Sequence, residues 1–306
     1  MVDIFIAVLG ALGASLGPVL TKKILATLPP FQTIFLLSFP AFLTTLIPSL
    51  IFGFKSISIK KPEMISTLLI IGFLYQSLPA CLTQIALVEV PSMVVVMLKR
   101  LQPLIIVVLL LLFRDHRVKI TDVLAAVISV SGVYFLLNSD GWALQVAQFL
   151  NPPVLLIVVS VVLWALMFIK TQSITRGIPA VFVACFTTGC LSVTSLPFAL
   201  AEGPWHFEKI DFSLGVLLLI NGPLAFGLGL WAIYRSLKIF HPMLMSLMML
   251  LGPVAALLVS TQFFDEELRG GQVLGVFLII GGLLCKIFGS DSKGNSPTGS
   301  MERTGA

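Results

Sequence analysis

The hydrophobic residues of this chain come in long continuous runs, and most polar and charged residues gather in short breaks between the runs. Most runs approach the roughly 20 residues that a helix needs to cross the hydrocarbon core of a bilayer. With boundaries set at Pro, Gly and charged breaks, the pattern predicts ten membrane-spanning helices, at residues 3–26, 31–53, 65–87, 92–113, 120–137, 153–170, 180–200, 213–234, 242–262 and 272–288. The predicted fold class is therefore all-α integral membrane.

Composition supports hydrocarbon as the main solvent of this chain. Hydrophobic residues make up 58% of the 306 residues and charged residues only 11%, and the mean hydropathy is +1.06. Soluble domains carry about 25% charged residues, so this chain could not cover a water-facing surface. The formal net charge of +5 is scattered over short loops, so the expected partners are the lipid bilayer and a small-molecule solute, and no nucleic acid.

Lys and Arg are divided unevenly between the loops of the two sides. With the N-terminus in the cytoplasm, 13 of the 19 Lys and Arg residues fall on the cytoplasmic side, 4 fall on the other side, and the last two lie within the fourth span. The positive-inside rule requires such an asymmetry, which an odd number of spans would erase. We therefore expect both termini in the cytoplasm. The plasma membrane is the default location because no organelle-targeting segment is evident.

The two halves of the chain repeat each other at an offset of 150 or 151 residues. The matching positions are Pro91 and Pro242, Pro103 and Pro253, Phe113 and Phe264, and Gly132 and Gly282. Five spans per copy is an odd number, so the second copy is inverted, and inverted repeats place a substrate site near the midplane at their interface. The predicted units are a five-helix repeat at 1–137, a connecting loop at 138–152, a second repeat at 153–288, and a disordered cytoplasmic tail at 289–306.

Each half ends in a Pro-containing helix, a short charged turn and a Gly-containing helix. This arrangement resembles the drug/metabolite transporter superfamily, and within it the EamA-type members. The two turns read Phe113-Arg114-Asp115-His116-Arg117 and Asp265-Glu266-Glu267-Leu268-Arg269, and the first departs from the Gly-Glu-Arg-like turn that the family often has. The resemblance covers about residues 1–288. It implies a ten-helix carrier with a central cavity for metabolites, amino acids, nucleotide-type solutes or drugs. The nucleotide-sugar and triose-phosphate translocators share this fold.

Two basic residues lie inside the fourth span. Lys99 and Arg100 follow its start by about 11 Å along the helix axis. A basic residue at this depth costs about 3 kcal/mol unless it faces protein, water or a counterion, and no Asp or Glu lies deep inside any predicted span. Lys99 shares a face with Gln102 and Pro103, which favours it as the group that attracts an anionic substrate, whereas Arg100 is expected to brace a neighbour or helix carbonyls. The alternative, that Lys99 extends to the nearer membrane surface, stays open.

Polar and aromatic residues recur at helical spacing in three other spans. Gln76 lies beside Tyr75 in the third span, Trp164 lies in the sixth, and Asn221 and Trp231 lie in the eighth. Polar groups in hydrocarbon require partners, so these rows are expected to face the interior of the bundle. The pattern leaves open whether they contact a substrate or hold neighbouring helices together. The candidate substrate-binding residues are Lys99, Gln102, Gln76, Tyr75, Asn221, Trp164 and Trp231.

Catalysis has little support in the sequence. The histidines His116, His206 and His241 fall in loops or at span ends, and no Gly-Lys-Ser/Thr phosphate loop is present. We therefore expect no catalytic residue, metal site or cofactor. The predicted function is transport of a small metabolite, anionic or amino-acid-like, by alternating access. The alternatives are a nucleotide-sugar or phosphate antiporter and, from other classes, a channel, an integral membrane enzyme or a non-transporting assembly factor. The oligomeric state is open.

Overall fold

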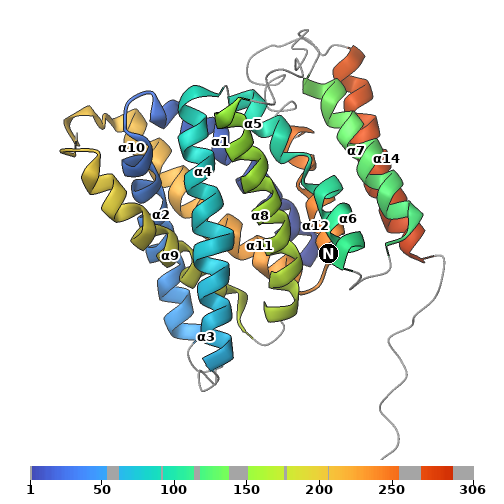
Figure 1. Ribbon diagram of the computed structural model, residues 1–306, viewed down its shortest axis with the longest axis horizontal. Coiled ribbons are helices and arrows are strands. Elements are labelled where there is room, and N and C mark those ends of the chain that lie inside the picture. The colour runs from blue at the N-terminus through green and yellow to red at the C-terminus, as the bar shows by residue number, and fades with distance from the viewer. Residues whose placement is uncertain are drawn as a thin grey trace, which may run out of the picture.

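The computed structural model describes residues 2–53, 62–90, 92–113, 118–137, 151–175, 178–205, 207–254 and 270–291. Throughout these ranges the regular secondary structure is helical, and the helices pack side by side in one bundle (Figure 1). The charged turns at 114–117 and 265–269, the loop at 138–150, His206 and the tail from residue 292 lie outside the described residues.

The helices of the first half match the first five predicted spans closely. They are α1 (Val2–Leu25), α2 (Pro30–Pro48) with its continuation η1 (Ser49–Gly53), the segmented third span α3 (Pro62–Leu69), η3 (Ile70–Ser77) and α4 (Leu78–Glu89), then α5 (Ser92–Lys99), α6 (Gln102–Phe113) and α7 (Ile120–Leu137). The segments η1 and η3 are π-helical, which widens the helix locally.

The helices of the second half follow the same order. They are α8 (Pro152–Thr175), α9 (Ala180–Ala201), the short 3₁₀ turn η5 (Phe207–Lys209), the segmented eighth span α10 (Phe212–Leu219), η6 (Ile220–Leu228) and α11 (Gly229–Leu237), then α12 (Pro242–Met248) and α14 (Gly270–Asp291). The π-helical segment η6 lies about 150 residues after η3, so the two halves share even this irregularity. Helix α8 continues to Thr175, five residues beyond the predicted end.

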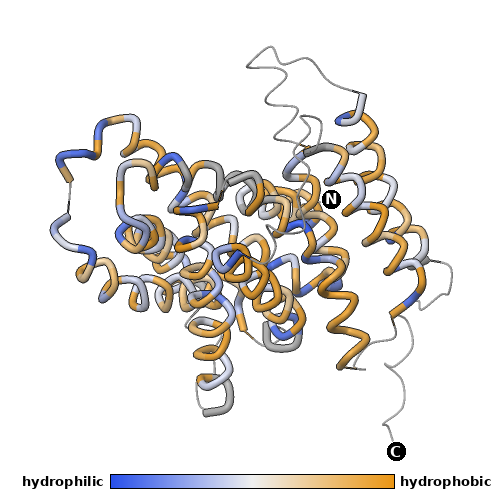
Figure 2. Tube along the Cα trace, turned by 45° about the horizontal axis from the view of Figure 1, so that its top comes forward, coloured by the Kyte–Doolittle hydropathy of each residue, from blue (hydrophilic) through white to orange (hydrophobic). Residues whose placement is uncertain are grey.

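Many of the described helices have the length and composition of membrane spans. Six segments meet both criteria: Pro30–Ile51, Ile65–Glu89, Pro152–Gln172, Ala180–Ala201, Phe212–Leu237 and Gly270–Gly289. Shorter apolar helices cover Val2–Gly13, Ile120–Phe135 and Pro242–Val254. Along the chain the hydrophobic stretches occupy the helices, and hydrophilic stretches gather mainly near the turns (Figure 2). The bundle therefore has the surface of a polytopic membrane protein.

The span predicted at 92–113 is present, but it consists of two helices, α5 and α6. Arg100 and Leu101 form a turn between α5 and α6, in which their N–H groups donate to the carbonyls of Met97 and Leu98, each at 3.0 Å. The ninth span is interrupted in the same way after α12, at Met249 and Leu250. A proline follows each interruption, Pro103 in the fourth span and Pro253 in the ninth. Proline lacks the N–H that would bond the carbonyl four residues earlier, and its ring crowds that carbonyl, which favours an interruption there.

Equivalent helices of the two halves make equivalent contacts with the opposite half. Helix α1 contacts η6 and α11 of the second half, and its counterpart α8 contacts η3 and α4 of the first half. Equivalent helices also meet directly, α2 with α9 and α7 with α14, and α2 and α9 further contact η6 and η3 of the opposite half. The α1–α2 connection lies at the upper end of the bundle and the equivalent α8–α9 connection at the lower end (Figure 1). The second half is therefore inverted relative to the first.

Helices α7 and α14 form a pair at one edge of the bundle (Figure 1). A Cβ atom at Gly282 of α14 would lie 2.8 Å from the carbonyl oxygen of Ala125 and would overlap the hydroxyl of Ser129. The mostly buried Asp122 accepts a hydrogen bond from Lys286, so one ion pair ties the two helices together at the lower end. Small residues and a buried polar pair hold helices together where lipid gives no hydrophobic drive.

Replacing Gly282 by Ala is expected to destabilise this helix pair by about 1–3 kcal/mol, because the carbonyl of Ala125 cannot move away without bending α7. The neighbouring Gly281 is the matched control, since a Cβ there meets nothing within 4 Å. Gly281→Ala should be neutral or stabilise by up to about 1 kcal/mol through helix propensity. Thermal unfolding in detergent measures both variants, and equal effects would contradict the close contact.

Candidate functional site

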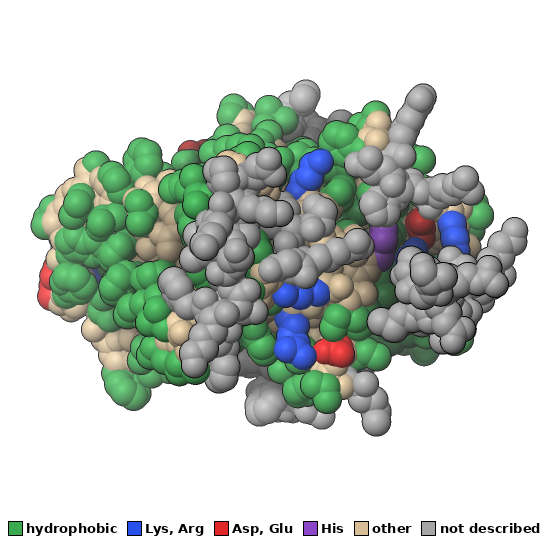
Figure 3. Space-filling model, turned by 90° about the horizontal axis from the view of Figure 1, so that it is seen from below, with side chains coloured by type: hydrophobic (Ala, Val, Ile, Leu, Met, Phe, Trp, Pro, Cys, Tyr) green, Lys and Arg blue, Asp and Glu red, His purple; other side chains and the backbone are tan. Residues whose placement is uncertain are grey.

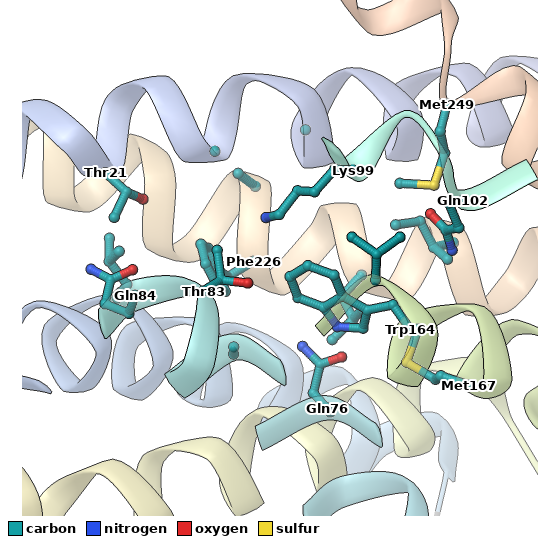
Figure 4. A pocket seen from close by; sticks show the side chains of 18 of the residues that line it. Thr21, Gln76, Thr83, Gln84, Lys99, Gln102, Trp164, Met167, Phe226 and Met249 are labelled. Carbon is teal, nitrogen blue, oxygen red and sulfur yellow. The ribbon is translucent and has the colours of Figure 1, made fainter. Parts of the chain in front are cut away.

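A cavity of about 150 Å³ lies between the two halves of the bundle. Residues of α1, α2, η3, α4, α5, α6, α8, η6 and α11 form its wall, together with one residue from each helix break. The polar side chains of the wall are Thr21, Gln76, Thr83, Gln84, Lys99, Arg100 and Gln102, and its larger apolar side chains include Trp164, Met167, Phe168, Phe226 and Met249 (Figure 4).

The packing of buried apolar residues differs between the two ends of the bundle. A single large cluster from both halves includes Tyr234, Leu237, Met243 and Met245, from the helices that meet at the lower end. Nearer the upper end the core divides into separate clusters, one around Ile24 and Leu214, another around Leu87, Val95 and Ile157, and a small one around Ile34 and Leu191. The cavity walls include members of all three of these clusters and also Met167, Phe168, Leu230 and Ile233 of the large cluster, so the cavity lies where the divided and continuous parts of the core meet.

Polar contacts add to the closure of the lower end. Arg235 of α11 lies 3.4 Å from the carboxylate of Asp3 at the start of α1. The ammonium group of Lys238 donates a 2.6 Å hydrogen bond to the carbonyl of Ile178, which precedes α9. Burial, assisted by the charge of Arg235, lowers the pKa of Lys238 below its usual value. These contacts join elements that are distant in sequence at the lower end of the bundle.

Lys99 extends from the end of α5 over the indole ring of Trp164 (Figure 4). Its ammonium nitrogen lies 4.3 Å from the ring centroid, which is the geometry of a cation–π contact. In the same view, the side chains of Thr83 and Gln84 lie on the side toward which the amine of Lys99 points. Gln76 lies on the far side of the indole ring from Lys99. In the described part of the chain no carboxylate lies within ion-pair distance of Lys99.

The carboxylates of Asp122 and Glu202, near other helix ends, already have partners. Asp122 binds Lys286, and Glu202, at the end of α9, accepts hydrogen bonds of 2.9 to 3.1 Å from the N–H groups of Phe31 and Gln32 at the start of α2. A carboxylate at a helix N-terminus satisfies free N–H groups and is favoured by the helix dipole. None of these carboxylates is in the cavity wall.

Several polar atoms in the wall have no hydrogen-bond partner within the described protein. Five such buried side-chain atoms belong to wall residues: Gln76 Oε1, Thr83 Oγ1, Gln84 Nε2, Arg100 Nε and Gln102 Nε2. Buried polar groups are otherwise almost always bonded, because an unbonded one costs about 1–3 kcal/mol. The five atoms include both acceptors and donors, so they fit a polar occupant of the cavity.

Arg100 connects the two helix breaks. Its guanidinium donates a 2.5 Å hydrogen bond to the carbonyl of Met249, in the other half of the chain. That carbonyl lies four residues before Pro253, so the proline cannot give it the N–H that a regular helix would provide. The expectation that Arg100 braces helix carbonyls is confirmed. The same bond holds the two interrupted spans against each other beside Lys99.

The structure brings four of the seven candidate residues together and separates the other three from them. Lys99, Gln102, Gln76 and Trp164 line the cavity. The remaining candidates, Tyr75, Asn221 and Trp231, are outside its lining. Asn221 is fully buried and donates a 3.0 Å hydrogen bond to the hydroxyl of Thr21, so it joins η6 to α1. The aromatic rings of Tyr75 and Trp231 pack against the large apolar cluster.

The structure also adds wall residues that the candidate set omits. Among them are Thr21, Gln84, Phe226 and Met249. Gln84 follows Thr83 inside an apolar span, and two adjacent polar residues at that depth are a signal that could have been used. Phe226 and Met249 carry no such signal, because an apolar residue in a span is equally suited to packing against lipid, helix or cavity.

The fold and this cavity define a polytopic helical membrane protein built from two inverted five-helix repeats. The pattern that defines the EamA-like transporter family matches residues 1–138 and 151–288, so the chain belongs to that family. A solved structure described only as "Crystal structure of protein" is similar to it, with a TM-score of 0.75 and 18% identity over 94% of this chain and 96% of that one. At this identity the likeness shows the shared fold alone. No curated protein matches the sequence.

A cysteine in place of Thr83 is expected to react with the charged reagent 2-sulfonatoethyl methanethiosulfonate, because a thiol ionises and reacts only where water reaches it. Ile85 on the same helix is the matched control, since it is 41% exposed on the outer surface of the bundle and would face lipid. In a background without the four free native cysteines, Thr83→Cys should react on the order of tenfold faster than Ile85→Cys. Equal rates would remove Thr83 from a water-filled cavity.

Proposed function

We propose that the protein carries a small solute with one negative charge, and that the cavity around Lys99 is the binding site. The observation that carries the proposal is a lysine beside an aromatic ring, in a cavity wall whose described residues include no carboxylate. The EamA-like family membership supports transport of small solutes across a membrane as the general activity.

The chemistry of the wall favours an anion over a cation. The ammonium of Lys99 can donate to an anionic oxygen, and such charge-assisted hydrogen bonds are about twice as strong as neutral ones. A cationic solute would face Lys99 and Arg100 with only amide and hydroxyl oxygens as compensation. The partnerless atoms of Gln76, Thr83 and Gln84 suit further polar groups of the solute, including the ammonium group of an amino acid.

The size of the cavity favours a small solute over a nucleotide sugar. A dry cavity of about 150 Å³ in another protein accepts benzene, and the cavity here has a similar volume. A nucleotide sugar contains a base, two sugars and one or two phosphates, which require several times that space. The antiporter of nucleotide sugars is therefore the weaker candidate for this site.

Alternating access in this proposal means that the repeats at 1–137 and 153–288 move about the cavity between two arrangements. The continuous core at the lower end and the divided core at the upper end support a state that is closed below. Basic side chains gather on the lower face (Figure 3), which supports placing that face and both termini in the cytoplasm. The plasma membrane is the proposed location.

Replacing Lys99 by Gln is expected to remove the preference of the cavity for an anion. We would compare benzenesulfonate with its near-isosteric neutral analogue benzenesulfonamide, by the rise in thermal stability that each gives the purified protein. The wild-type protein should bind the sulfonate about tenfold or more tightly than the sulfonamide, because a hydrogen bond to a charged group contributes about 1.5–3 kcal/mol. In Lys99→Gln the two affinities should become similar.

The control variant is Lys170→Gln. Lys170 also lies over an aromatic ring, 5.4 Å from the centroid of Phe113, but it is exposed near the lower end of α8 and is not in the cavity wall. It should keep the wild-type preference. If wild-type protein bound the sulfonamide as well as the sulfonate, an anionic substrate would be the wrong conclusion.

A further inference from the structure

We infer that the connection between α9 and α10 is an anchor that lies in the phospholipid headgroup layer and holds the α2–α9 helix pair at one depth in the bilayer. This α9–α10 connection comprises residues 202–211 and lies at the upper left edge of the bundle (Figure 1). The inference goes beyond solute transport, because it concerns the membrane itself as a binding partner.

Hydrogen bonds fix the start of the connection to α2. The carboxylate of Glu202 accepts bonds of 2.9 to 3.1 Å from the N–H groups of Phe31 and Gln32, in the first turn of α2. In return, the side-chain amide of Gln32 donates a 3.3 Å bond to the carbonyl of Gly203. Gly203 has a φ of 108°, which favours glycine. The chain therefore leaves α9 in one defined direction and is tied to α2.

Aromatic rings join the connection to the same two helices. Phe198 of α9 stacks on Phe31 of α2, with ring centroids 4.9 Å apart. Trp205 of the connection lies edge-on to Phe35 of α2 at 5.6 Å and stacks on Phe207 at 5.7 Å. Aromatic pairs with these geometries attract each other beyond the area that they bury. The rings therefore add to the hydrogen bonds in holding the connection in place.

The exposed side chains at this place have opposite solvent requirements. Phe207 is 60% exposed, and Phe212, the first residue of α10, is 89% exposed. Glu208, Lys209 and Asp211, which lie between them, are exposed as well. Water would leave two large apolar side chains uncovered, and hydrocarbon would leave three charged groups unsolvated. The headgroup layer offers partners to both kinds, and amphipathic segments with aromatic residues settle there.

The apolar surfaces on both sides of the connection identify phospholipid as its partner. The last turns of α9 expose Leu196, Phe198 and Leu200, and α10 exposes Val216 and Leu219. In a membrane-spanning bundle such side chains contact the acyl chains of lipids. The connection lies where these two lipid-facing surfaces end, so its exposed rings continue them into the headgroup layer.

The α2–α9 pair is the part of the bundle that this anchor holds. The two helices contact each other directly. The hydroxyl of Ser192 donates a 3.1 Å bond to that of Ser38, and the hydroxyls of Thr45 and Thr188 lie 3.4 Å apart. Because the connection continues α9 and is bonded to α2, its depth in the headgroup layer sets the depth of both helices.

The test measures the depth of Trp205 in phosphatidylcholine vesicles that contain the full chain. The other three tryptophans, Trp142, Trp164 and Trp231, are replaced by Phe. Fluorescence is quenched by phospholipid brominated next to the headgroup, by phospholipid brominated near the methyl end of the acyl chain, and by aqueous iodide. The shallow bromines should quench Trp205 severalfold more strongly than the deep ones, because indole rings in the headgroup layer lie closer to them.

Two further reporters make the depth specific. Val193 is exposed on α9 about 12 Å before its end, so Val193→Trp with all native tryptophans replaced should be quenched more by the deep bromines. Phe212→Trp in the otherwise native chain, measured as the difference from wild type, should be quenched more by the shallow bromines. This second measurement removes no native tryptophan, so it stands even where those replacements harm folding.

The variant Glu202→Ala tests the tie between the connection and α2. It removes the acceptor of the N–H groups of Phe31 and Gln32, so the preference of Trp205 for shallow bromines should fall toward one and iodide quenching should rise. The control is Glu89→Ala, which removes one exposed carboxylate at the end of α4. It should keep the quenching pattern of the protein with Glu202.

Every other pattern overturns the inference. Iodide quenching equal to that of free N-acetyltryptophanamide, with no effect of either lipid, would place the connection in water. Stronger quenching by the deep bromines would place it in hydrocarbon, and protection from all quenchers at position 212 would assign the rings to contact with a second copy of the chain. An unchanged pattern in Glu202→Ala would separate the connection from the α2–α9 pair. None of these readings involves solute binding, so the proposed function is tested separately.

Discussion

Hydrocarbon offers no hydrogen bonds, and this constraint governs the two helix breaks beside the cavity. A backbone carbonyl that loses its helical partner in such a solvent has to find another one inside the protein. Pro103 and Pro253 each release a carbonyl near the middle of a span, and the chain breaks at both places. Arg100 binds the one at Met249. The breaks occur beside the cavity, where an unbonded group can also meet water or a solute.

Much of the fold could be predicted from the sequence because lipid imposes simple rules on a chain. Span positions follow from apolar length, the repeat from prolines and glycines spaced by 150 or 151 residues, and the inversion from an odd number of spans per copy. The breaks after Lys99 and Met248 were missed. A proline inside a span permits a kink, a π turn or a full interruption, and the packing of the other half decides among them.

The candidate site was predictable chiefly where a residue type is costly in a membrane, and Trp164 is the exception. Lys99, Gln102 and Gln76 are polar at depth and all reach the cavity. Asn221 is also polar at depth, yet its amide donates a hydrogen bond to the hydroxyl of Thr21 on the neighbouring helix. The sequence gives the depth of such a residue and its approximate face, but a polar group facing inward has two kinds of partner. Only the direction of the neighbouring helix distinguishes a structural bond from a wall of the cavity.

The contacts of like with like have a consequence for the origin of the chain. Helix α2 meets α9, its own counterpart, and α7 meets α14 in the same manner, so these surfaces are self-complementary about a pseudo-twofold axis in the membrane plane. Such an isologous surface does not require two halves to be joined. A free-standing five-helix ancestor with these faces would associate with a second copy of itself inserted the other way up. Gene fusion would then preserve that antiparallel dimer and release each half to diverge, as Lys99 of the first repeat and Met249, in the matching position of the second, already have.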